Sequence, residues 1–429
     1  MEKFFKLKQM NSSVKQEFNA GLTTFLTMMY IIPVNAIIMG NTGMPIEALL
    51  TATALVTILA TGLNGFFSNT PIALSVGMGL NAYFTFGLVA GMKIPWQTAL
   101  GVVFLSGAIF LVLSLTNFRI WILKSIPLDL RRAISAGIGA FISFIGLKEM
   151  GIIVHNEATL VGLGNFSDHN TLLGLFGLAM VVLFWALRVK GAFIIAVLIT
   201  SIVAWSFGIS PKPDKFFSLP ASISPIFLEL DIVGAFSLAL IPAIVTFFIT
   251  QLFDSLGTLS GVGNRAKLFD AKDGMKKFEK TLGVDAFAST TGSLLGVSTV
   301  TAFAESASGV EEGGRTGLTA VVTAAFFILT LFMLPLFGAI PGNAVYPVLI
   351  MVGVMMFSEL VNINFKDSAI CVASFFIVML MPLTYSITTG LAFGFVAYFF
   401  VRLVKREFEF LNIGVVFLAA ISLISFIIR

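Results

Sequence analysis

The sequence predicts an all-α polytopic membrane protein with about 14 transmembrane segments, arranged as two inverted repeats of seven. Composition, the charge of the loops and two interrupted spans lead to this prediction. Hydrophobic residues make up 57% of the 429 residues and charged residues 11%, whereas an ordinary soluble domain is about half apolar and about a quarter charged. A chain this poor in charge needs lipid rather than water around most of its surface.

The spans follow from length, because a helix needs about 20 apolar residues to cross the hydrocarbon core. Runs of this kind recur along the whole chain. The predicted spans are 18–40, 47–68, 72–91, 96–115, 131–150, 171–188, 191–208, 232–261, 283–296, 298–310, 315–338, 344–360, 367–383 and 386–404. A further hydrophobic segment, 411–428, either crosses the membrane or lies against the bundle.

Basic residues in the loops fix the predicted orientation. The N-terminal tail, 1–17, is basic, and every later basic loop follows an even number of spans. Short basic loops stay in the cytoplasm, so we expect a multi-pass protein of the cell (plasma) membrane with a cytoplasmic N-terminus. The opposite loops hold both histidines, His155 and His169. The basic loop residues are Arg119, Lys124, Arg131, Arg132, Arg188, Lys190, Arg265, Lys267, Lys272, Lys276, Lys277, Lys280, Arg315, Lys366, Arg402, Lys405 and Arg406.

The third and tenth spans are abnormal. Each begins with a short β-branched or alternating stretch and then becomes rich in small residues, over 70–81 and 296–309. We interpret each as an extended half followed by a helical half, which is tolerated at membrane depth only inside protein or beside a polar cavity. Interrupted segments at matching positions of inverted halves indicate a transporter site.

The orientation of these two spans sharpens the prediction. The third runs outward and the tenth inward, so both helical halves begin near the middle of the membrane. Two helix N-termini then face each other, and their unpaired N–H groups suit an acceptor-rich or anionic ligand.

Two of the 22 acidic residues lie well inside predicted spans, Asp254 and Glu305. Acids at this depth are costly and mark functional sites. Glu305 falls in the first turn of the tenth half-helix, where the dipole favours a carboxylate. Gln251, Asp254 and Thr258 follow the spacing of one helix face. Proton coupling through the two acids is one hypothesis, and a sodium ion held by Asp254 and Thr258 is the alternative.

Four further residues are candidates for contact with the solute. Asn81 lies in the first turn of the third half-helix, and its amide can donate and accept hydrogen bonds; a structural bond between helices is the alternative. Gly79 permits close approach of the backbone or is a packing glycine. Phe303 and Phe84 either stack on a ring or belong to the apolar core.

The motifs that contain these residues resemble those of the AzgA-like hypoxanthine/adenine/guanine permeases, a branch of the nucleobase–cation symporters related to the nucleobase–ascorbate transporters. The resemblance extends from about Ala20 to the C-terminus. The matching motifs, in chain order, are 71–84, 252–259, 298–307 with 313–322, and 381–387.

This resemblance implies uptake of a purine base, namely adenine, guanine or hypoxanthine, together with protons, by a core domain moving against a gate domain. It implies that Gly79, Asn81, Asp254 and Glu305 bind substrate, and we add Ala304 and Phe303 beside Glu305. Asp254, Glu305 and Thr258 are the predicted ion-coupling residues. The implied domains are core at 18–115 and 232–338, and gate at 131–208 and 344–404, with 1–17 as the tail and 411–428 as the extra segment.

Two departures from the family pattern bear on these expectations. Ser75-Val76 replaces a usual Ala-Pro, and Gln251 lies near a position that is usually acidic, so the choice between proton and sodium stays open. A homodimer through the gate domain is what the related fold suggests, and membrane lipid is the surrounding partner.

Other classes of function fit the sequence less well. An anion carrier of related fold would need a basic residue where Glu305 stands, while uracil or xanthine remains an alternative solute. An enzyme would need a metal cluster or a nucleophile–base pair at depth, whereas both histidines lie in loops and Cys371 is the one thiol. No cofactor, catalytic residue, metal site or nucleic-acid partner is expected.

Overall fold

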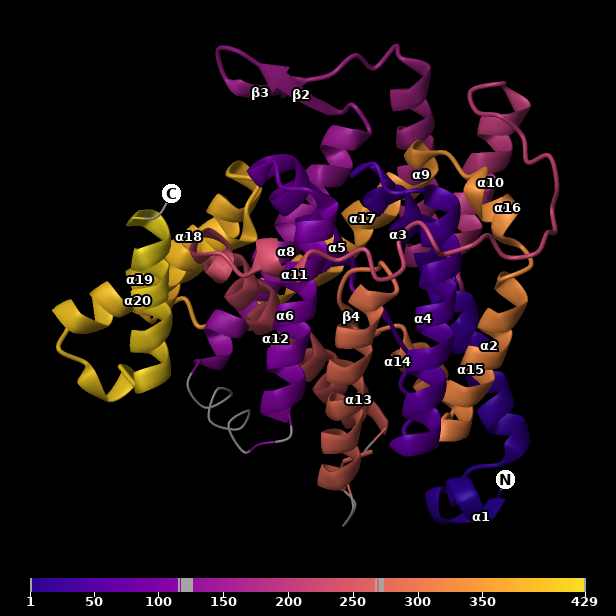
Figure 1. Cartoon of the computed structure of the whole chain (residues 1–429), viewed down its shortest axis with the longest axis horizontal. Coiled ribbons are helices and arrows are strands. Elements are labelled where there is room, and N and C mark those ends of the chain that lie inside the picture. The colour runs from indigo at the N-terminus through magenta and orange to yellow at the C-terminus, as the bar shows by residue number, and fades with distance from the viewer. Residues whose placement is uncertain (1, 115, 117–125, 267, 270–273, 428–429) are drawn as a thin grey trace.

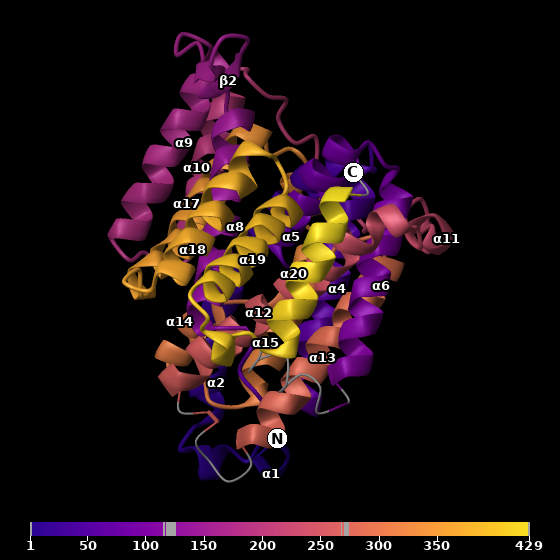
Figure 2. The same cartoon turned by 90° about the vertical axis from the view of Figure 1, so that its left-hand side faces the viewer.

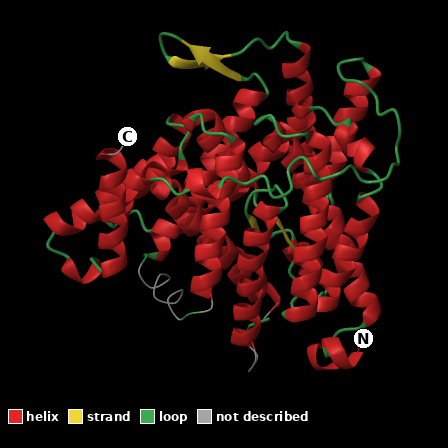
Figure 3. Ribbon diagram, in the orientation of Figure 1, coloured by secondary structure: helices red, strands yellow, loops and turns green. Residues whose placement is uncertain are grey.

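The computed structural model describes residues 2–114, 116, 126–266, 268–269 and 274–427. Arg119, Lys124, Lys267 and Lys272 of the predicted basic loops, and the last residue of the segment 411–428, lie outside this part. The described chain is a bundle of helices with two short two-stranded sheets (Figures 1 and 3).

Eight helical stretches of the described chain are long and apolar enough to cross a membrane. The first is interrupted after Met28 and continues from Ile31. These stretches are formed by α2 (Val14–Met28) with α3 (Ile31–Gly40), α4 (Ile46–Phe67), α6 (Trp96–Ser114), α8 (Leu128–Glu149), α9 (His169–Ala186), α12 (Ile241–Ala266), α17 (Gly342–Phe357) and α19 (Ile387–Val404).

Shorter helices supply further predicted spans. Four apolar ones are α10 (Ala192–Ser206), α15 (Gly317–Thr330), α18 (Ser368–Leu383) and α20 (Ile413–Ile427). The ninth predicted span corresponds to α13 (Gly274–Leu294), which starts nine residues before the expected 283. Its first turns carry Lys276, Lys277 and Lys280, so a search for apolar residues alone underestimates the length of this helix.

The eighth predicted span also differs at its start. Residues 232–240 form α11 (Ile232–Ala235) and the short turn η3 (Leu238–Leu240), and α12 starts at Ile241. The side chain of Asp231 accepts a hydrogen bond from the N–H of Gly234 at 2.8 Å, which closes a separate turn. Pro242 then suits the first turn of a new helix, where its missing N–H costs nothing.

The third and tenth spans are each half strand and half helix, as predicted. The third contains β1 (Leu74–Val76), α5 (Met78–Ala82) and the π-helical η2 (Tyr83–Gly91). The tenth contains β4 (Val300–Ala302) and α14 (Ser306–Glu311). The two strands pair antiparallel, with Ser75 opposite Thr301. Segments 226 positions apart therefore meet in one small sheet inside the bundle.

Hydroxyl groups complete the outer edges of this sheet. Thr61 of α4 hydrogen-bonds both the N–H and the carbonyl of Leu74, at 3.0 and 2.8 Å. Ser289 of α13 bonds the N–H and the carbonyl of Val300 in the same way. An unpaired strand edge is not tolerated in the hydrocarbon region. In each repeat the equivalent helix supplies the hydroxyl that pairs the edge, α4 as the second span and α13 as the ninth.

The helices pack in two groups (Figure 2). In the first group, α15 packs against α2 and α4, and α6 packs against α12 and α13. In the second, α8 packs against α17 and α18, α9 against α10 and α17, and α19 against α18. The N-terminus lies at one end of the molecule, and the hairpin of β2 (Ile153–Asn156) and β3 (Leu160–Leu163) lies at the other (Figure 1). We call these the N-terminal end and the hairpin end.

The remaining described elements are short. They lie at the ends of spans or continue them. They are α1 (Glu2–Phe5), η1 (Leu7–Met10), α16 (Leu334–Gly338), η4 (Ser358–Asn362) and η5 (Phe408–Phe410).

Candidate functional site

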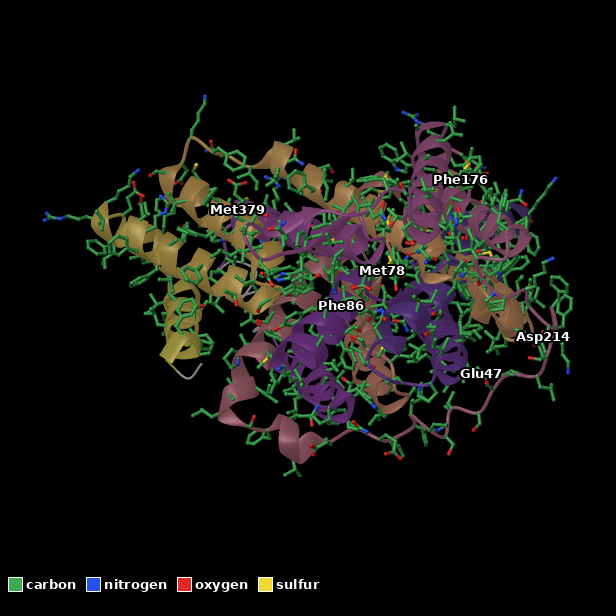
Figure 4. The ribbon with its side chains drawn as sticks, turned by 90° about the horizontal axis from the view of Figure 1, so that it is seen from above. Glu47, Met78, Phe86, Phe176, Asp214 and Met379 are labelled. Carbon is green, nitrogen blue, oxygen red and sulfur yellow. The ribbon has the colours of Figure 1, made fainter. Side chains whose placement is uncertain are left out.

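The two half-helices begin directly beside the paired strands. Gly77 precedes α5 and Glu305 precedes α14, each at the N-cap position. Both helices therefore start at the same small sheet. The first N–H groups of α5 stay unpaired there, whereas those of α14 close short turns, such as the bond from the N–H of Ala307 to the carbonyl of Ala304 at 2.9 Å. Figure 4 shows Met78, the first residue of α5, in the middle of the bundle. This arrangement agrees with the two facing N-termini predicted from the sequence.

Asp254 lies next to this sheet. It is half-buried on α12, and its Oδ2 accepts a hydrogen bond from the hydroxyl of Thr301 on β4, at 3.1 Å. Gln251, one turn earlier, is fully buried and uses its amide nitrogen on Ser289 and on the carbonyl of Val300. The predicted polar face of α12 is therefore divided: Gln251 holds the sheet, and Asp254 stays partly accessible.

A third acid, Asp285, is part of the same network and was not predicted. It is fully buried on α13 and accepts a hydrogen bond from the hydroxyl of Ser255, which lies 3.1 Å from the hydroxyl of Thr301. Its Oδ1 has no hydrogen-bond partner among the described residues. The sequence did contain a signal, because Lys277, Thr281 and Asp285 recur every four residues on the buried face of α13.

Glu305 accepts a hydrogen bond from the hydroxyl of Tyr30, which lies between α2 and α3 in the interrupted first span. Tyr30 is fully buried, whereas Glu305 is partly exposed and its neighbour Ala304 is exposed. Sequence reasoning missed Tyr30. The break that precedes Pro33 in an apolar run was the available signal.

A chain of hydrogen bonds fixes how the amide of Asn81 points. The hydroxyl of Thr53 donates to the carbonyl of Leu49 at 2.6 Å, so its oxygen can only accept from Asn35. The amide nitrogen of Asn35 faces Thr53, and its oxygen accepts from the amide nitrogen of Asn81 at 2.5 Å. Asn81 itself is fully buried, and its Oδ1 has no partner within the described chain. Its Oδ1 is therefore an acceptor whose position the chain of hydrogen bonds fixes.

The remaining predicted residues surround these groups. A Cβ added to Gly79 would lie 2.7 Å from Cγ2 of Ile138 on α8, so glycine allows the two helix groups to touch here. Phe303 and Phe84 are buried, and Thr258 lies one turn beyond Asp254 and is half-buried. The face of α12 that follows toward the N-terminal end is exposed and consists of small residues, Gly257, Ser260 and Gly261.

Comparison with known proteins identifies the family. The family Xan_ur_permease, described as a permease family, matches residues 15–405. The chain belongs to this permease family. The match covers both half-helices and the three acids near them, Asp254, Asp285 and Glu305, and together with the apolar helices it shows a multi-pass membrane transporter.

Relatives of this permease match it along nearly the whole chain. A putative permease of Methanocaldococcus jannaschii is 43% identical over all of this chain and 98% of its own. Adenine permease AdeP of Escherichia coli is 38% identical over all of this chain and 96% of its own. Guanine/hypoxanthine permease PbuO of Bacillus subtilis is 38% identical over 99% of this chain and 100% of its own.

A solved structure shares the permease's fold. The transmembrane domain of the cyanobacterial bicarbonate transporter BicA superposes with a TM-score of 0.65, covering 87% of this chain and 97% of that domain. At 16% sequence identity this likeness concerns the fold alone. It confirms the predicted fold class, helical inverted repeats divided into a core and a gate domain.

Proposed function

We propose that this permease is a symporter that takes up purine nucleobases, adenine, guanine or hypoxanthine, together with protons. The observation that carries the proposal is the convergence of Asp254 and Glu305 on the point where two half-helices begin. The names of the relatives support the solute class, because an adenine permease and a guanine/hypoxanthine permease are each 38% identical to this chain.

The chemistry of the site suits the edge of a purine. A purine base is flat, with ring N–H groups and either an amino or an oxo group on its rim. Asp254, Glu305 and the free oxygen of Asn81 offer acceptors for the N–H groups. The unpaired backbone N–H groups at the start of α5 offer donors for ring nitrogens or an oxo group. Phe303 and Phe84 contribute the apolar surface against which a ring can lie.

Protons are the coupling ion that we favour, because carboxylates lie together behind the site. Asp254 and Asp285 are linked through the hydroxyls of Thr301 and Ser255. A carboxylate can take up and release a proton, and acids at membrane depth commonly form such proton paths. Sodium coupling through Asp254 and Thr258 is the alternative that the experiment below tests.

The movement that we propose is alternating access, with the first helix group as the core domain and the second as the gate. The assignment rests on packing, since α14 packs against α2 and α12, and α5 packs against α3 and α12 as well as α8. The helix α8 itself packs mainly against α17 and α18. The close contact of Gly79 with Ile138 lies where the two would move past each other. The exposed face of Gly257, Ser260 and Gly261 is the route we propose toward the N-terminal end, on the cytoplasmic side.

The test is uptake of radiolabelled adenine, guanine, hypoxanthine and uracil into cells that lack their own carriers, with and without a protonophore. We expect purine uptake that collapses with the protonophore. Uptake that persists without a proton gradient but requires sodium would replace the ion and keep the site. Absence of uptake of every purine would refute the proposed solute class.

Variants of the two acids test the site itself. Glu305→Ala and Asp254→Ala should each abolish uptake, since a lost charged hydrogen bond and a lost ionisable group both act at the substrate. Glu157→Ala is the matched control, because Glu157 is exposed in the hairpin between β2 and β3. The amount of each protein in the membrane is measured in parallel. Full uptake by a well-expressed Glu305→Ala variant would contradict the assignment.

A further inference from the structure

Tyr30 is hydrogen-bonded to Glu305, the carboxylate that the proposed function assigns to substrate binding. Its hydroxyl donates to Oε1 of Glu305, 275 positions away in the sequence. Tyr30 is fully buried, and Glu305 has no side-chain hydrogen bond to the start of its own helix, α14. A carboxylate at membrane depth without a partner is costly. Tyr30 therefore satisfies an acid that a bound base would otherwise satisfy.

The backbone around Tyr30 is weakened in a way that allows this side chain to move. Pro33 has no N–H, so the carbonyl of Met29 loses its usual partner in the next turn. It accepts instead from the N–H of Ile32, at a long 3.4 Å. The first span is consequently broken into α2 and α3 at Tyr30. Breaks of this kind are where membrane helices bend.

The ring of Tyr30 also touches the other helix group. It packs edge-on against Phe193 of α10, with ring centroids 5.2 Å apart and an interplanar angle of 83°. The hydroxyl of Tyr30 thus contacts Glu305 at the start of α14 in the first helix group, and its ring packs against Phe193 of α10 in the second. A movement between the two groups therefore changes the contacts of the Tyr30 side chain.

We infer that Tyr30 is a positioning residue that stands in for the substrate in the empty carrier; this rests on the proposed function. When a purine arrives, an N–H of the base replaces the hydroxyl of Tyr30 on Glu305, and Tyr30 swings aside at the break between α2 and α3. When the base leaves, the hydroxyl returns. The empty carrier then returns to the conformation that is open to the outside, and Glu305 stays hydrogen-bonded during this step, as it is when the base is bound.

Exchange and net uptake separate this role from a structural one. Net uptake needs the empty carrier to return, whereas exchange of labelled for unlabelled base across the membrane does not. In Tyr30→Phe we expect the maximal rate of net purine uptake to fall about tenfold, the worth of a hydrogen bond to an ionised group, while exchange stays within about twofold of the unchanged protein. Tyr398→Phe is the control, a buried tyrosine of α19 whose ring lies beside Arg402.

A binding measurement on the purified protein provides the second test. Because Tyr30 pairs with Glu305 only when the site is empty, Tyr30→Phe should lower the thermal stability of the empty protein. Saturating purine should restore it to the value of the unchanged protein with the same base. Loss of stability that persists with bound purine, or an equal loss of exchange and net uptake, would mean that Tyr30 is only structural.

Other outcomes of these experiments would also contradict the inference about Tyr30. A rise in the dissociation constant for purine in Tyr30→Phe would mean that Tyr30 binds the base directly, which contradicts the inference. Unchanged net uptake would contradict it as well. If the unchanged protein takes up no purine, the proposed function and the inference fall together; if it does and only the pattern for Tyr30→Phe is absent, the inference alone falls.

Discussion

The hydroxyl of Thr53 determines which way two buried amides point. Because it donates to the carbonyl of Leu49, it forces Asn35 to donate to it and Asn81 to donate to Asn35. The sequence shows that Asn81 has an amide capable of both roles; the structure ties its nitrogen to Asn35 and leaves its oxygen without a partner in the described chain. An acceptor at this point favours a base with an amino or ring N–H group there and disfavours an oxo group.

Asn35→Ala tests this restriction. Without Asn35 the amide of Asn81 can turn over and offer its nitrogen, so discrimination between adenine and hypoxanthine should change by about tenfold, the worth of one hydrogen bond at a buried site. The ratio is measured by competition of the two bases for uptake. Asn41→Ala is the control, since Asn41 is exposed at the end of α3. An unchanged ratio would mean that Asn81 does not face the base.

Asp285 gives a second test at the scale of single residues. Asp285→Asn keeps a group that can accept from Ser255 and removes the charge. We expect purine to bind with an affinity within about threefold of the unchanged protein, while accumulation against a gradient is lost, because the second carboxylate needed for proton exchange is absent. Binding and protonophore-sensitive uptake are measured on the same preparation. Accumulation that survives would remove Asp285 from the coupling path.

At the scale of elements, a carboxylate from one helix caps another. Glu17 of α2 is fully buried and accepts from the N–H groups of Arg315, Thr316 and Thr319 at the start of α15. It also accepts from the hydroxyl of Thr319. These donors are among the groups that a helix N-terminus leaves unpaired. Glu17 thus ties the first span to the eleventh, which belongs to the opposite repeat.

Glu17→Ala should therefore destabilise the folded protein by about 2–3 kcal/mol, through a lost cap and buried N–H groups without partners. Glu17→Gln, which can still accept with its amide oxygen, should lose less than half of that. Thermal unfolding in detergent gives the comparison. Equal stability of all three proteins would show that water satisfies these donors.

The sequence predicts an element well where a local pattern of residues forms it, and poorly where distant partners do. The interrupted third and tenth spans were predicted because Gly, Ser and β-branched residues leave a local pattern, and the pairing of Ser75 with Thr301 confirms it. The start of α13 was predicted nine residues late, because buried lysine and aspartate on one helix face do not look apolar. Tyr30, Asn35 and Asp285 were missed because their roles come from partners far away in the chain, which no local pattern contains.

At the scale of the whole molecule, polar bridges join the two helix groups at two levels. Lys190, between α9 and α10, forms an ion pair with Glu312, which follows α14. Further from the N-terminal end, the hydroxyl of Tyr83 in η2 bonds that of Thr388 on α19, which donates to Thr246 on α12 at 3.0 Å. This bridge is further from the N-terminal end because the chain runs from Asn69, which donates to the carbonyl of Phe5, through β1 and α5 to η2. Any movement of one group against the other must break or remake these bridges.

A charge exchange at the first bridge tests whether it controls this movement. Lys190 is exposed and Glu312 is half-buried, so the pair lies at the surface and contributes at most about 1 kcal/mol. Lys190→Glu and Glu312→Lys should each lower net purine uptake by about two- to fivefold, because like charges then repel across the two groups. The double variant restores the opposite charges and should recover uptake to within about twofold of the unchanged protein. Added salt should shrink the differences by screening exposed charges. A double variant as slow as either single one would show that the pair does not couple the two groups.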